Sequence, residues 1–161
     1  MSTIQRRSAF GVCAAMLALL GMTTNVWGRG SCAGPRDVVA LKTAEMQQEL
    51  MVAALSCHET HLYNRFVIGY RTQLQRSDAV LRGYFARRGG MAAYHAYKTR
   101  LANDASLRSL HDIEGYCSRA RATFHDALDE DGVTLAMLVA DRSATGAAVC
   151  RGRMRVAERP E

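Results

Sequence analysis

The stretch that decides the fold is residues 38–57, which read VVALKTAEMQQELMVAALSC. Most positions at three- and four-residue spacing along it are apolar. These positions are Val38, Leu41, Ala44, Gln48, Met51, Val52 and Leu55. This period is that of an α-helix with one largely apolar face. Because Pro35 and Asp37 suit a helix start, we predict a helix from Asp37 to about Cys57.

A second helical pattern follows at once. Thr60 is a suitable N-cap, and the Gly89-Gly90 pair is a helix-end signal, so we predict one long helix between them. Its apolar stripe consists of Tyr63, Phe66, Val67, Tyr70, Leu74, Leu81, Tyr84 and Phe85. Tyrosine recurs at every seventh position except where Ser77 interrupts the series. Such a stripe either lines a ligand groove or packs in the core with its hydroxyls at the rim, and we favour the core.

The remaining patterns are also helical. A third helix is expected from Met91 to about Leu101 or beyond, with residues 103–106 either a break or a weak point in a longer helix. Asp112 is a good N-cap for a fourth helix. Residues 129–132 form a turn, and residues 133–139 are read as helix because the chain offers no partner strand. The sequence thus predicts an all-α bundle of four to five helices.

The chain begins like an export signal. Arg6 and Arg7 precede an uncharged run over residues 9–22, which suits a signal peptide better than a membrane span. We predict a signal peptide over residues 1–28, with an uncleaved anchor as the alternative. A lead-in at 29–36, a helical domain at 37–141 and a C-terminal segment with a mobile tail at 142–161 would follow. The protein would then be periplasmic or secreted, without a stable membrane span after cleavage.

The charge of the chain bears on its partners. The net charge is +6, carried almost entirely by arginine. A mild positive charge suits anionic envelope surfaces as well as nucleic acid, and export argues against nucleic acid.

Cysteine usage predicts a covalent framework. The chain beyond the signal keeps four cysteines: Cys32, Cys57, Cys117 and Cys150. An even number in an exported chain indicates two disulfides. Four cysteines allow three pairings, of which we favour Cys57 with Cys117 inside the helical core and Cys32 with Cys150 between the ends.

The segment His58-Glu59-Thr60-His61 resembles a zinc-protease motif at first sight. That motif requires two histidines four residues apart on one helix, and here the spacing is three, at an expected helix break. A metal at His58 and His61 is therefore not favoured. Ala54 stands where covalent haem attachment would need a cysteine. We expect no cofactor.

One weak anion-binding pattern remains. Arg87 and Arg88 precede a helix start, where guanidinium and backbone N–H groups can hold a phosphate or carboxylate, and Lys98 follows in the same helix. No nucleophile or nucleotide-binding motif is complete, so enzyme activity is uncertain and not favoured. The favoured function is a binding or accessory protein that takes an envelope protein or a small anionic ligand. The alternative is a small metal-dependent hydrolase that uses His58 and His61.

Four segments resemble a group of small exported proteobacterial helical proteins of unknown function. The segments are residues 41–57, Tyr63-Asn-x-Phe66, Phe85-x-Arg-Arg-Gly-Gly90 and residues 94–104. Some members carry automatic labels that name an S-adenosylhomocysteine hydrolase. This chain is too short for that enzyme and lacks a dinucleotide-binding βαβ unit. The resemblance implies an exported helical domain in which Cys57 and Cys117 are framework residues, and it implies no activity.

Overall fold

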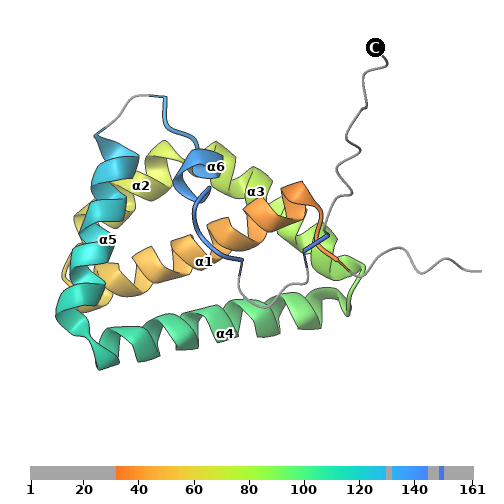
Figure 1. The fold of residues 1–161 in the computed structure, drawn as a ribbon, viewed down its shortest axis with the longest axis horizontal. Coiled ribbons are helices and arrows are strands. Elements are labelled where there is room, and N and C mark those ends of the chain that lie inside the picture. The colour runs from red at the N-terminus through yellow and green to blue at the C-terminus, as the bar shows by residue number, and fades with distance from the viewer. Residues whose placement is uncertain (1–31, 130–131, 145–148, 151–161) are drawn as a thin grey trace, which may run out of the picture.

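The structure is a computed structural model that describes residues 32–129, 132–144 and 149–150. Its described part holds six helices and no strand (Figure 1). The helices are α1 (Pro35–Ser56), α2 (Thr60–Gly69), α3 (Arg71–Ala86), α4 (Gly90–His111), α5 (Ile113–Leu128) and α6 (Leu135–Leu138). The all-α prediction is confirmed. The predicted signal peptide, residues 1–28, and the predicted mobile tail, residues 151–161, lie outside the described residues.

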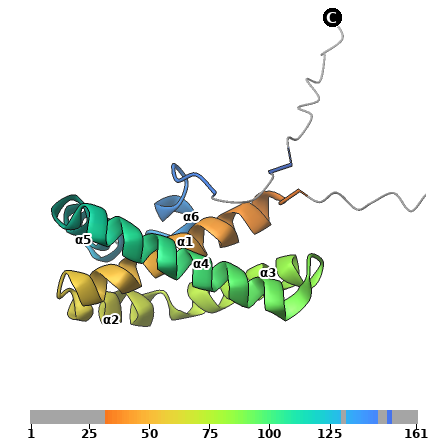
Figure 2. The ribbon, with the colours of Figure 1, turned by 90° about the horizontal axis from the view of Figure 1, so that it is seen from below.

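Helix α1 is the centre of the bundle. It contacts each of the other five helices, and α4 runs along it in the same direction (Figures 1 and 2). No residue from Asp37 to Ala54 is exposed. The predicted apolar face is therefore not the only covered one, since half of the residues from Asp37 to Ala54 are buried and the other half are half-buried. Leu55, which we placed on the apolar face, is 71 % exposed, whereas Leu50 is fully buried.

The long second helix is in fact two helices. Helix α2 ends at Gly69, and α3 begins after Tyr70, whose backbone leaves helical geometry at φ −98° and ψ 10°. The buried Tyr70 hydroxyl donates to the Ala127 carbonyl oxygen at 2.8 Å, which ties this junction to α5. The junction between α2 and α3 is thus held against a distant part of the chain.

The start of α2 also differs from expectation. Glu59 occupies the N-cap position, and Thr60 is the first helical residue. The Thr60 hydroxyl donates to the Ala54 carbonyl oxygen at 3.2 Å, so it secures the end of α1 instead of capping α2. His58 reverses the chain between these helices with φ +59°.

Three other local predictions are confirmed. Helix α4 runs unbroken through residues 103–106, so that segment is only a weak point. The Asp112 carboxylate caps α5 by accepting the Gly115 N–H at 2.9 Å. The segment after the predicted turn, of which residues 130–131 lie outside the described residues, contains the short helix α6. The first helix begins at Pro35, two residues before the expected Asp37.

The core consists of two clusters that share α1. The first joins α1, α2, α5 and α6 around the fully buried Phe66, Tyr116 and Phe124. The second joins α1, α3 and α4 and includes Leu81 and Tyr97. Two tyrosines of the predicted stripe are buried in these clusters, Tyr70 in the first and Tyr84 in the second. The stripe is therefore part of the core.

Two disulfides close the framework. Cys57 at the end of α1 is bonded to Cys117 on α5, with Cα atoms 5.7 Å apart. Cys32 is bonded to Cys150, with Cα atoms 4.9 Å apart, and the Cys150 N–H donates to the Ala33 carbonyl oxygen. These are the two pairings that the sequence analysis favoured. Such bonds are typical of proteins in oxidising compartments. Within the described residues, none of the helices combines the length and the apolar character that a membrane span requires.

Candidate ligand-binding site

The two histidines of the apparent metal motif lie on a corner. His58 is in the turn, and the exposed His61 ring is 4.0 Å from the Glu59 carboxylate. Glu59 is itself bound by the Arg121 guanidinium at 2.6 Å. Among the described residues no three side chains of His, Cys, Asp or Glu are grouped to hold a metal ion. The corner therefore offers no third ligand from that part of the chain.

Arg87 and Arg88 serve the packing of the bundle. The Arg88 guanidinium donates to the Cys32 carbonyl oxygen at 2.8 Å and lies 4.0 Å above the centre of the Tyr84 ring. Arg87 pairs with Asp37 at 3.5 Å. These contacts fasten the turn between α3 and α4 to the start of α1. Both arginines are therefore engaged with the protein.

Lys98 lies elsewhere, in a pocket of about 430 Å³ to which neither arginine contributes. We call this the cationic pocket. Its walls come from α1, α2, α3 and α4. The lining residues are Gln47, Val67, Arg71, Leu74, Gln75, Asp78, Arg82 and Lys98. Three cationic side chains thus face one carboxylate.

The one carboxylate that lines the cationic pocket, that of Asp78, already has partners within the protein. Asp78 accepts the Tyr94 hydroxyl hydrogen bond at 2.6 Å and pairs with Arg82 at 3.2 Å. Burial, reinforced by Asp78, raises the pKa of Tyr94 to about 12, so this hydroxyl remains a donor at neutral pH. Arg71 has no ion-pair partner among the described residues. The pocket therefore carries a net positive charge.

Lys98 is the least exposed of the three cationic side chains of this pocket, since it is half-buried whereas Arg71 and Arg82 are exposed. Burial lowers the pKa of its ammonium group, and the charge of Asp78 opposes that effect only in part. A half-buried ammonium group gains from a further negative charge, because that charge replaces part of the interaction lost with water. Lys98 is therefore well placed to recognise an anion.

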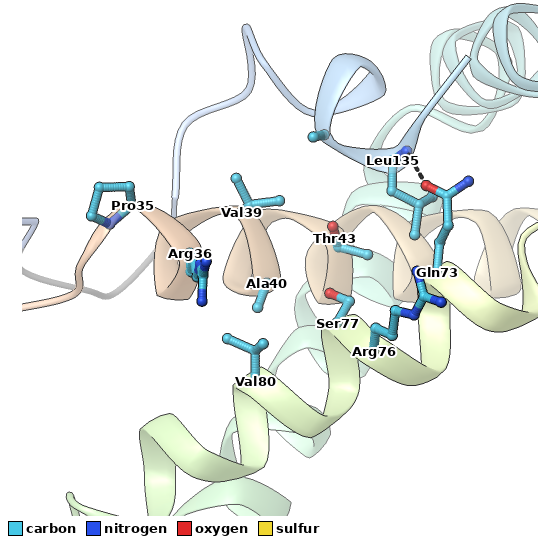
Figure 3. Close-up of a pocket in the computed structure, with 11 residues that line it drawn as sticks. Pro35, Arg36, Val39, Ala40, Thr43, Gln73, Arg76, Ser77, Val80 and Leu135 are labelled. Carbon is cyan, nitrogen blue, oxygen red and sulfur yellow. Dashed lines mark hydrogen bonds between the residues drawn. The ribbon is translucent and has the colours of Figure 1, made fainter. Parts of the chain in front are cut away.

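A second cavity, of about 450 Å³, lies between α1, α3 and α6 (Figure 3). We call it the apolar groove. Apolar side chains from all three helices line it, among them Val39, Val80 and Leu135. The Leu135 N–H donates to the Gln73 side-chain oxygen at 3.0 Å, and this bond holds α6 over α3.

Sequence reasoning identified Lys98 but missed the rest of the cationic pocket. A signal was present: Arg71, Gln75, Asp78 and Arg82 follow three- and four-residue spacing and so share one face of α3. The apolar groove had no such signal. Its walls join residues about sixty positions apart in sequence, such as Gln73 and Leu135.

Comparison of the chain with protein-family models, with curated proteins and with solved structures gives no match. The resemblance described above remains a prediction.

Proposed function

We propose that the protein is a periplasmic or secreted, non-enzymatic binding protein whose ligand is a small oxyanion with carboxylate or phosphate groups. The observation that carries the proposal is the cationic pocket, in which Arg71, Arg82 and Lys98 line one cavity with a single, already paired carboxylate. The volume is in the range of ordinary small-molecule sites. The two disulfides support an oxidising compartment.

The side chains of the pocket match the chemistry of an oxyanion. A guanidinium presents paired N–H donors, and an ammonium provides a compact charge. Gln47 and Gln75 add amide donors at the wall. Val67 and Leu74 supply apolar surface, which lowers the local dielectric and strengthens each charge contact. The set provides donors around an anion and contains no group arranged to break a bond in it.

Calorimetric titration with citrate and with inorganic phosphate tests this proposal. We expect Arg71→Gln and Lys98→Gln each to weaken binding by about tenfold or more, since a hydrogen bond to a charged group contributes about 1.5–3 kcal/mol. Arg65→Gln is the matched control, because it removes the same charge from an exposed site outside the pocket. It is expected to leave the Kd within about twofold.

Two outcomes would overturn the proposal. The first outcome is that the unmodified protein binds neither citrate nor phosphate at low ionic strength. The other is equal weakening in Arg65→Gln and Lys98→Gln, which would indicate attraction by net charge and no defined site. Preference for citrate or for phosphate distinguishes carboxylate from phosphate ligands.

The lowered pKa of Lys98 predicts a pH dependence for citrate binding. Citrate favours the charged ammonium group, so binding is strongest below the pKa of Lys98 and declines as pH rises through it. Because this pKa lies below the usual lysine value, the decline begins at lower pH than for an exposed lysine. Lys98→Arg keeps its charge throughout and should remove the decline. Titrations between about pH 7 and about pH 10 check this; the same decline in Lys98→Arg would contradict it.

A further inference from the structure

Two buried hydroxyl groups in the apolar groove lack hydrogen-bond partners. They are Thr43 Oγ1 on α1 and Ser77 Oγ on α3. Thr43 is only 2 % exposed, and both residues line the groove, where Figure 3 shows them in the middle of the row of lining side chains. Buried hydroxyls are normally paired, so two unpaired ones in one cavity indicate a missing acceptor.

The protein itself does not offer that acceptor within the described residues. A hydroxyl on a helix commonly donates to the carbonyl oxygen four residues earlier, as Thr123 does to Arg119. The hydroxyl groups of Thr43 and Ser77 form neither this hydrogen bond nor any other one within the described residues. A third cavity beside them has only about 10 Å³, the lower limit for a single water molecule. A ligand oxygen that reaches them from the groove would supply the missing acceptor.

The rest of the groove indicates the character of that ligand. Val39, Val80 and Leu135 provide apolar surface on three sides. Arg36 and Arg76 also line the groove, and neither has an ion-pair partner among the described residues. The lining on α1 extends from Pro35 to Thr43, a helix length of about 12 Å. An extended medium-chain hydrocarbon with an anionic oxygen group fits this length and this charge.

We propose that the apolar groove is a second binding site, which takes a medium-chain aliphatic carboxylate. The carboxylate accepts a hydrogen bond from Thr43 or Ser77 and is neutralised by Arg76, which is next to Ser77 on α3. The hydrocarbon chain packs against the valines and Leu135. The site differs from the cationic pocket, whose polar walls suit a small hydrophilic anion.

Titration calorimetry with octanoate tests this site, with octanol as the uncharged probe. Thr43→Val keeps the shape of the side chain and removes the hydroxyl. It is expected to weaken octanoate binding by about tenfold or more. The free variant should melt at the same or a higher temperature, since an unpaired buried hydroxyl is removed. Arg76→Gln should weaken octanoate binding and leave octanol binding unchanged.

Thr72→Val on the exposed side of α3 is the matched control and should bind octanoate like the unmodified protein. Lys98→Gln should also leave octanoate binding unchanged, which separates this site from the cationic pocket. Failure of the unmodified protein to bind octanoate would overturn the proposal. So would unchanged octanoate binding in Thr43→Val. A lower melting temperature of that variant would show that the Thr43 hydroxyl is paired within the free protein, which would also contradict the proposal.

Discussion

The double variant Cys57→Ala/Cys117→Ala is expected to lose about 4 kcal/mol in free energy of unfolding. The bond closes a chain separation of 60 residues, and the chain-entropy model assigns about this value to a loop of that length. Both cysteines also belong to the core cluster of Phe66 and Tyr116, so their replacement removes packed sulfur atoms. Urea unfolding under non-reducing conditions, followed by circular dichroism, measures the change.

The second disulfide supplies the comparison for this experiment. Cys32→Ala/Cys150→Ala removes a bond that lies outside both core clusters and joins the ends of the described chain. Once Cys57 and Cys117 are bonded, the additional loop that it closes runs through residues 32–57 and 117–150 and is about as long as the loop of the first disulfide, so the entropic contributions are similar. Its loss should be the smaller one because it removes no sulfur atom from either core cluster. A loss below about 1 kcal/mol for Cys57→Ala/Cys117→Ala would show that this disulfide does not secure the bundle.

Leu50→Ala is expected to lower the free energy of unfolding by about 2–5 kcal/mol, the range for a fully buried leucine. Leu50 has no exposed surface and packs in the cluster shared by α1, α2 and α5. Leu55→Ala removes the same atoms five residues later from a side chain that is 71 % exposed. That variant should change stability by less than about 0.5 kcal/mol.

The two leucine variants distinguish the observed structure from the simple amphipathic pattern of the sequence, because the two place different leucines in the core. The three-and-four spacing of α1 puts Leu55, and not Leu50, on the apolar face. Equal losses in the two variants, or a larger loss for Leu55→Ala, would contradict the central position of α1. Thermal or urea unfolding of both proteins in parallel gives the answer.

Local sequence signals predicted most of the helices. The carboxylate of Asp112 and the glycines at 89 and 90 act within one turn of their own position, so their effects are visible in the sequence. The break at Tyr70 was missed, although Gly69 directly before it is a local helix-end signal. The hydrogen bond from Tyr70 to Ala127, 57 residues away, could not be predicted, because only the folded chain brings the two into reach.

The candidate site was predictable only in part, for the same reason. Lys98 was identified from its charge, and Arg71 and Arg82 share a helix face that the pattern could have revealed. Arg87 and Arg88 were singled out from their charge, and their partners Asp37 and Cys32 come from the other end of the domain, where the pattern could not show them. A pattern shows which charges are neighbours in sequence and not which are already paired in space.

The most direct test of the binding function is an amide NMR titration of the ¹⁵N-labelled protein with citrate. The account predicts saturable shift changes that are largest around Arg71 and Lys98 and in the side-chain amides of Gln47 and Gln75. In Lys98→Gln these changes should require about tenfold more citrate or more, whereas Arg65→Gln should titrate like the unmodified protein. Shift changes centred on Arg87 and Arg88, or no saturable change at all, would contradict it.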